Sequence, residues 1–142
     1  MKFQLLENID DKDIDILKEA YDDSSVKRFI EIDKENFWSY VTETENVYFY
    51  KVYLGDILVG TAQCELINNV LYFALVVFPL YRNNGIGYDI VKHVIGGITG
   101  LHFSRLRVSI DEANIASLSL FKKIGFVQIG RDNLLIDFEY VI

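Results

Sequence analysis

The chain has 142 residues, of which 51% are apolar and 25% charged, with one proline and nine glycines. This length and composition predict a single folded domain over residues 1–142 and exclude collagen-like, low-complexity and disordered chains. No uncharged run is long enough for a membrane helix, and the N-terminus lacks the apolar stretch of a signal peptide. The lone Cys64 excludes an internal disulfide, so we expect a reducing, cytoplasmic location and no metal site.

The net charge of −7 is unevenly distributed. Residues 1–45 contain 13 acidic and 6 basic side chains, whereas residues 46–142 contain 8 of each. Nucleic-acid binding favours clustered Lys and Arg, so this pattern argues against a nucleic-acid partner. A cationic small molecule would fit the acidic segment, although solvated helix faces would explain the same charges.

The periodicity of apolar residues predicts the elements of the first half in chain order. They are a strand over Lys2–Leu6, helices over Asp11–Tyr21 and Asp33–Glu43, and strands over Val47–Leu54 and Ile57–Leu66. Asp33 is the predicted N-cap of the second helix, and Phe37, Trp38 and Val41 form its apolar stripe. Tyr48, Tyr50 and Tyr53 fit one face of their strand poorly, so we expect some of them to be exposed.

The second half begins with nine consecutive apolar residues, Val70–Phe78, which predict a central strand covered by helices on both faces. The elements that follow are a helix over Gly85–Ile98, a strand over Arg105–Ile110, a helix over Ala113–Ile124 capped by Gly125, and strands over Phe126–Ile129 and Leu134–Val141. The strand–helix–strand unit predicts a parallel pair, and short turns predict antiparallel neighbours. The fold class is therefore α/β, with a mixed, mostly antiparallel sheet and helices on both faces.

The segment between the central strand and its helix carries the strongest functional signal. Pro79 ends the strand ladder, and Arg82 is followed by Gly85 and Gly87 at the start of a helix. Unpaired N–H groups at a helix N-terminus, together with an arginine, suit a pyrophosphate. The Walker loop is absent, and the dinucleotide fingerprint fails because Ile90 occupies its third glycine position. Taken alone, the two glycines are better explained by an ordinary strand-to-helix turn.

Two separate motifs give the chain a family resemblance. Val77-x-Pro79-x-Tyr81-Arg82-x-x-Gly85-Ile86-Gly87 resembles the acyl-coenzyme A motif of the GNAT superfamily of N-acetyltransferases. Downstream, the segment from Asn114 to Phe126 is similar to that family's N-x-x-[AS]-x-x-L-[YF]-x-K-x-G-F helix. The order of elements also matches over essentially the whole chain. The resemblance implies a GNAT fold whose parallel central strands splay apart and an activity that uses acetyl-coenzyme A (acetyl-CoA).

The resemblance also implies which residues hold the cofactor. Leu75 and Val77 match the positions whose main chain pairs with the pantetheine arm. The matching pyrophosphate loop is Arg82, Asn83, Asn84, Gly85, Ile86, Gly87 and Tyr88. Asn114 matches an asparagine that bonds the pantetheine arm, and a helix N-cap is its other interpretation. Ser117, Phe121 and Lys123 lie on the same helix, where Lys123 is either near the adenosine phosphates or simply solvated.

The resemblance leaves the catalytic side chains unknown. Phe121 stands where the family often has a tyrosine that serves as the general acid. Leu71 and Ser109 stand near positions where some members carry a general base. Four interpretations follow: catalysis by positioning and water, a substitute residue, an acceptor that arrives deprotonated, or little turnover. The substitutes are Glu65, Glu112 and Tyr140. His93 and His102 are better explained as structural or surface residues, Cys64 as a small buried side chain, and Phe37 and Trp38 as core.

These observations predict an N-acetyltransferase that passes an acetyl group from acetyl-CoA directly to a primary amine of a small molecule or peptide. The alternative is a CoA-binding regulatory module with weak or no transferase activity. A toxin that acetylates aminoacyl-tRNA is a third hypothesis, which the net charge of −7 disfavours. We expect no membrane partner, and apolar residues on the closing strands, if exposed, would support a homodimer.

Overall fold

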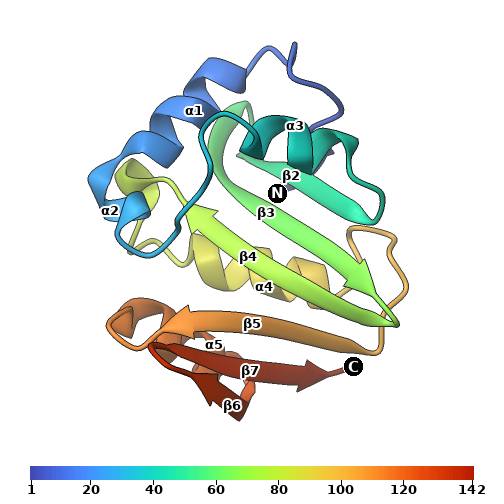
Figure 1. Ribbon diagram of the computed structural model, residues 1–142, viewed down its shortest axis with the longest axis vertical. Helices are drawn as coiled ribbons and strands as arrows, with labels where there is room; N and C mark the ends of the chain where they lie inside the picture. Colours follow the sequence, from blue (N-terminus) through green and yellow to red (C-terminus); the bar gives the residue numbers. More distant parts are fainter.

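A computed structural model describes residues 1–142 as one seven-stranded sheet with helices on both faces (Figure 1). The sheet order is β1-β2-β3-β4-β5-β7-β6. The strands are β1 (Lys2–Leu5), β2 (Val47–Leu54), β3 (Ile57–Ile67), β4 (Val70–Val77), β5 (Arg105–Asp111), β6 (Val127–Asp132) and β7 (Leu135–Val141). The helices are α1 (Ile14–Asp22), α2 (Ser24–Lys27), α3 (Phe37–Glu43), α4 (Ile86–Ile95) and α5 (Ile115–Ile124), with a 3₁₀ turn at Pro79–Tyr81.

The strand directions agree with the sequence prediction. β4 and β5 are parallel, and every other neighbouring pair is antiparallel. A mixed α/β sheet with one parallel central pair is therefore confirmed. None of the helices is both long and apolar enough to cross a membrane.

Two hydrophobic clusters fill the opposite faces of the sheet. On one face, α4 and α5 pack through residues such as Ile90 and Phe121 against β4, β5 and β7. On the other face, Leu17 of α1 and Trp38 of α3 pack around Phe49 of β2. Burying side chains of this size contributes about 1.5–3 kcal/mol each, so both clusters hold the sheet in place. The helices α1–α3 cover only the β1–β4 part of their face, and no helix crosses in front of β5 and β7 (Figure 1).

The prediction that helices cover both faces of the central strand is therefore wrong in part. Leu71 and Phe73 are buried beneath α4 and α5, but Tyr72 and Ala74, which point to the other face, are exposed. Only further along the strand, at Val76, does the α1–α3 cluster cover this face. The apolar run did not reveal this opening, because helix placement depends on contacts far apart in sequence.

Several local predictions also need correction. The first helix begins at Ile14 rather than Asp11, and α2 was not anticipated. Asn36, not Asp33, is the N-cap residue of α3, since the Asp33 carboxylate instead accepts from the Glu35 N–H in the preceding turn. Helix boundaries of this kind depend on local turns that compete for the same polar side chains.

The tyrosines of β2 are not exposed as expected. Tyr50 and Tyr53 are buried and Tyr48 is half-buried, because both faces of β2 are covered: Tyr50 lies in the cluster beneath α4 and α5, and Tyr53 lies in the cluster beneath α1–α3. Cys64 is fully buried, as predicted, and burial raises the pKa of its thiol to about 12.

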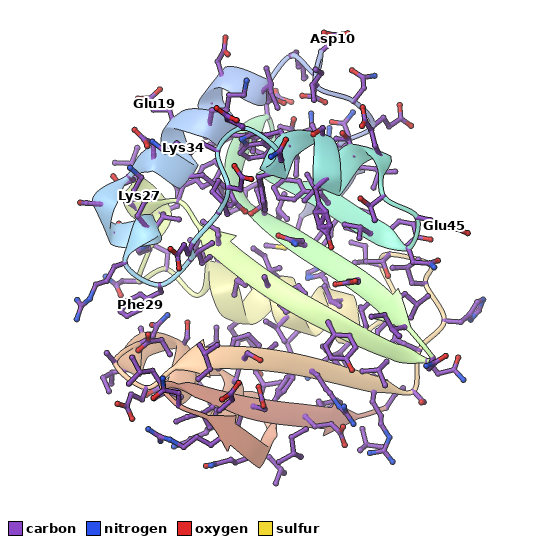
Figure 2. The ribbon with its side chains drawn as sticks, in the orientation of Figure 1. Asp10, Glu19, Lys27, Phe29, Lys34 and Glu45 are labelled. Atoms are coloured by element: carbon purple, nitrogen blue, oxygen red, sulfur yellow. The ribbon has the colours of Figure 1, made fainter.

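A buried ion cluster fastens the segment before α1 to the sheet. Lys51 of β2 has no exposed surface, and its Nζ donates to Asp11 Oδ1 at 2.8 Å and to Asp13 Oδ2 at 2.9 Å. The Tyr53 hydroxyl also donates to Asp13. Some of the acidic charge of the first third is therefore internal. Other charges of that segment, including Glu19, Lys27 and Lys34, project outward from it (Figure 2).

Candidate active site

β4 and β5 separate before either strand ends. Their parallel pairing runs only from Val70 and Arg105 to Tyr72 and Arg107, although β4 continues to Val77 and β5 to Asp111. In Figure 1 the two strands start side by side and diverge toward their arrowheads. A cleft of about 540 Å³ occupies the widening gap and extends to the loop before α4 and to α5. Backbone groups along the gap are therefore available to a ligand instead of to a neighbouring strand.

The loop between β4 and α4 has the backbone geometry of an anion site. Its pairing ends at Phe78, whose N–H donates to Val59, and Pro79 then starts a 3₁₀ turn. Gly85 has a φ of +76°, which favours glycine. The backbone N–H groups from Asn83 to Tyr88 donate to no acceptor in the protein. Such a run of free donors at a helix N-terminus fits a phosphate group.

Gly87 also allows close packing at the start of α4. A Cβ atom there would lie 3.2 Å from Leu120 Cδ2 and 3.5 Å from Leu75 Cδ2. The absence of a side chain therefore lets the start of α4 pack closely against α5 and β4. This packing brings the free N–H groups of the loop to the end of the gap.

Arg82 joins three parts of the cleft wall. Its Nε donates to the Val77 carbonyl at 3.2 Å, and its Nη1 donates to Ser25 Oγ at 2.8 Å. Because backbone groups alternate in direction along a strand, Leu75 directs its N–H and C=O to the same side as Val77. The guanidinium thus combines a fixed positive charge with contacts that position the loop, the end of β4 and α2.

The first turn of α5 forms the opposite wall. Asn114 Oδ1 accepts from the Ser117 N–H at 3.2 Å, so this side chain is the N-cap of α5 while also facing the cleft. Phe121 is buried, with its ring edge-on to those of Phe73 and Phe126. Lys123 Nζ lies 5.4 Å from the centre of the Tyr88 ring, which places a cation beside the loop.

The cleft gathers nearly all of the residues that the sequence singled out for the cofactor. Those that line it are Leu75, Val77, Arg82, Asn83, Gly85, Ile86, Gly87, Tyr88, Asn114, Ser117, Phe121 and Lys123. Asn84 is exposed and lies outside the lining, with its amide nitrogen donating to the Arg82 carbonyl at 3.3 Å.

Sequence reasoning missed one wall of the cleft, which comes from α2 and the residues after it. The lining residues there are Ser25, Val26, Phe29 and Ile30. Figure 2 shows Phe29 below α2, on the side to which β4 and β5 diverge. The sequence signal was the Asp23-x-Ser25 pair, since the Asp23 carboxylate accepts from the Ser25 N–H and caps α2.

None of the substitute bases named from the sequence lines the cleft. Glu112 is paired with Arg131 at the surface, and Tyr140 packs against Phe126. Glu65 is half-buried on β3. His93 and His102 are exposed, as surface residues would be, and no group of three or more His, Cys, Asp or Glu side chains is arranged to hold a metal ion.

The comparison with known families decides the assignment. The model of the acetyltransferase (GNAT) family matches residues 12–126. The chain belongs to the GNAT acetyltransferase family. The splayed β4–β5 pair and the loop before α4 both lie within the region that matches the family. No curated protein matches this GNAT chain in sequence.

Solved structures show the same fold at low sequence identity. The chain is similar to the ribosomal-protein-S18-alanine N-acetyltransferase from Escherichia coli, with 16% identity, a TM-score of 0.76 and coverage of 99% of this chain and 93% of that one. It is also similar to aminoglycoside acetyltransferase AAC(6')-Ib in complex with coenzyme A, with 14% identity, a TM-score of 0.80 and coverage of 99% of this chain and 94% of that one. The fold is also similar to that of a spermidine N-acetyltransferase chimera that includes Vibrio cholerae sequence. The identity is 11%, the TM-score is 0.79, and the match covers 99% of this chain and 96% of that one.

Proposed function

We propose that this GNAT protein transfers the acetyl group of acetyl-CoA to a primary amine of a small molecule or peptide, by direct attack in a ternary complex. The observation that carries the proposal is the single cleft in which the open strand gap meets the free N–H groups from Asn83 to Tyr88. The loop would hold the diphosphate, with Arg82 and Lys123 beside it. The exposed backbone of Leu75 and Val77 would hold the pantetheine arm.

The cleft offers polar backbone groups where acetyl transfer needs them. The attacking amine must be neutral, and a donor must polarise the thioester carbonyl. Backbone N–H groups along the unpaired part of β4 are suited to the second task. Thiolates leave well, so the reaction does not require a side-chain acid at Phe121.

A cationic amine is the acceptor class that best fits the exposed side of the gap. This face carries Glu65 on β3, Arg105, Arg107 and Asp111 on β5, and Asp137 and Glu139 on β7, so its four carboxylates outnumber its two arginines. The E. coli relative is an alanine N-acetyltransferase, and other relatives act on aminoglycosides and spermidine by their names. Acceptors of these kinds therefore form a suitable panel.

Two α5 variants would test whether the cofactor occupies the cleft. Ala116 and Ser119 are both exposed, but only Ala116 lines the cleft. Ala116→Trp should weaken acetyl-CoA binding in calorimetry by about tenfold or more, because the indole would fill the gap. Ser119→Trp should leave binding unchanged. Equal affinity for both variants would place the cofactor elsewhere.

Turnover is tested with the wild-type protein, acetyl-CoA and a panel of cationic, neutral and peptidyl amines, with mass spectrometry of the acetylated product. Acetylation of at least one amine is the expected result. Tight binding of acetyl-CoA with no product on any amine would favour the second candidate, a CoA-binding regulatory module. The observation that favours this candidate is Phe121, whose buried ring has no proton to donate.

A further inference from the structure

One residue on each strand, two positions beyond the last β4–β5 pair, marks the fork of the cleft, the point where the two strands begin to diverge. Tyr72 and Arg107 are the final paired residues, and Ala74 and Ser109 come two positions later on the same face. Both are exposed, and both line the cleft. No helix covers β5 on this side (Figure 1). A molecule arriving from this face therefore meets the Ser109 hydroxyl where the strands begin to diverge.

Ser109 is coupled to a carboxylate on the next strand. Ser109 and Asp137 are partners in the β5–β7 register, and Ser109 Oγ donates to Asp137 Oδ1 at 2.5 Å. Asp137 is half-buried and forms no ion pair, so its charge is not committed to a cation. Glu139, two residues along the same strand, is instead held by both Arg105 and Arg107.

Asp111 is the only carboxylate that lines the cleft directly, and it has another task. It lies two residues beyond Ser109, further from the fork, and its Oδ1 accepts from the Ala113 N–H at 2.8 Å. This contact shapes the turn that leads into α5. The hydroxyl–carboxylate pair of Ser109 and Asp137 is therefore the better placed proton acceptor at the fork.

We propose that Ser109 is a catalytic residue that takes a proton from the acceptor amine, and that Asp137 is its positioning residue and receives the proton in turn. This inference rests on the proposed function and names the general base of that reaction. It also explains how the chain can work without an acidic residue in β4 or at position 109 itself.

The proton and electron movements balance in this scheme. A proton of the bound ammonium first moves to Ser109 Oγ as the Ser109 hydroxyl proton moves to Asp137 Oδ1, which leaves a neutral amine. The amine lone pair then forms the new C–N bond with the thioester carbonyl carbon. The C–S bond breaks, its electron pair stays with sulfur, and the thiolate takes up the proton that the nitrogen loses, directly or through water. The products are the N-acetylated amine and free coenzyme A, and Asp137 returns its proton to solvent.

The charges around Asp137 permit this cycle. On one side of it along the shared face, Arg105 and Arg107 are both paired with Glu139, whereas Asp111 and Asp132 lie on the other side. On β6 its partner is the uncharged Gly130. The surrounding carboxylates favour an incoming cationic amine, since Arg105 and Arg107 are engaged with Glu139 and Arg131 on β6 is engaged with Glu112.

Asp137→Asn is the most direct test, since an amide oxygen keeps the hydrogen bond from Ser109 but cannot take up the proton. We expect kcat/KM for a strongly basic amine at neutral pH to fall about 10²-fold or more. The variant's rate should continue to rise with pH until the amine itself is deprotonated, whereas the wild-type rate levels off earlier. With a weakly basic amine, which is already neutral, the deficit should shrink to less than about fivefold.

Further variants separate the relay from a structural effect. Ser109→Ala should show the same dependence on amine basicity, and the double variant should lose no more than either single one, because the two residues act as a unit. Asp56→Asn removes an equal charge from the β2–β3 turn, outside the cleft, and should leave the rate unchanged. Acetyl-CoA affinity and melting temperature should stay at wild-type values in Asp137→Asn.

The outcomes distinguish the two proposals. An equal loss with strongly and weakly basic amines, or no loss at all, overturns the relay while leaving the acetyltransferase function intact. A wild-type protein that acetylates no amine overturns both. A wild-type protein that is active, with an Asp137→Asn deficit that disappears for neutral amines, supports both.

Discussion

Arg82 and Ser25 join two parts of the chain that are 57 residues apart, through a 2.8 Å hydrogen bond from the guanidinium to the hydroxyl. The contact links the loop before α4 to α2, which lines the other side of the cleft. The same guanidinium donates to the Val77 carbonyl. Changes at Arg82 should therefore affect both the anion site and the wall formed by α2.

Arg82→Ala should weaken acetyl-CoA binding by about tenfold, because it removes a fixed charge and hydrogen bonds that hold the loop. Calorimetry with acetyl-CoA measures this change. Ser25→Ala is the matched control, since it removes the contact with α2 but keeps the charge and should cost less than about threefold. Equal losses for the two variants would mean that the charge itself contributes nothing.

Gly85→Ala should weaken acetyl-CoA binding through the backbone. Gly85 has a φ of +76° with open space around it, so an added methyl group meets no atom but strains the backbone by about 1 kcal/mol. Gly55→Ala, in the β2–β3 turn, carries the same kind of strain at a φ of +59°. Both variants should lose similar stability in urea unfolding, whereas only Gly85→Ala should bind acetyl-CoA less tightly.

Lys51→Met should strongly destabilise the fold. The substitution leaves the Asp11 and Asp13 carboxylates facing each other without their buried cation, and the expected loss of unfolding free energy is about 3 kcal/mol or more. Urea unfolding at neutral pH measures it. Lys27→Met, which removes a more exposed pair with Asp22, should cost less than about 1 kcal/mol. Similar losses for the two lysines would contradict the buried-cluster interpretation.

The Lys51→Met defect should depend on pH. Burial alone would raise the pKa of Asp13, but hydrogen bonds from Tyr53 and Lys51 outweigh it and hold the pKa below the usual 3.8. A lowered carboxyl pKa stabilises the wild type above 3.8, and this contribution is lost as the pH falls through the folded-state value. In the variant the Asp13 carboxylate lacks its cation, so protonation of Asp13 removes an unpaired negative charge and reduces the destabilisation.

The stability difference between wild type and Lys51→Met should therefore narrow as the pH is lowered from about 7 to about 3. Melting temperatures across this range measure the trend. A difference that stays constant would show that Asp13 does not titrate differently in the two proteins.

The sequence predicted the parts of this fold that depend on local patterns. The run Val70–Phe78, the glycines after Pro79 and the helix begun at Asn114 each carry their signal within about a dozen residues. The short helix α2 has only four residues, too few for apolar periodicity to appear. Its place in the cleft wall depends on the contact between Arg82 and Ser25, which are distant in sequence.

In the candidate site too, residues within local motifs could be predicted, whereas those that depend on distant contacts could not. The predicted cofactor residues converge because two continuous motifs flank the gap. Asp137 could not be found in this way, since its relation to Ser109 depends on the register in which β7 pairs with β5. A carboxylate in a closing strand has no distinctive sequence pattern of its own. The exposed face beside Tyr72 was likewise hidden, because the apolar run of β4 does not show where covering helices stop.

The burial of Cys64 has a practical consequence for assays of this protein. The chain's sole sulfhydryl is fully enclosed, and its raised pKa keeps it protonated at neutral pH. Colorimetric disulfide reagents attack the thiolate form, so the native protein should contribute almost no background colour. Any signal from such a reagent in a turnover mixture would then report released coenzyme A, and a slow increase in a mixture without acetyl-CoA would reveal exposure of Cys64 by unfolding.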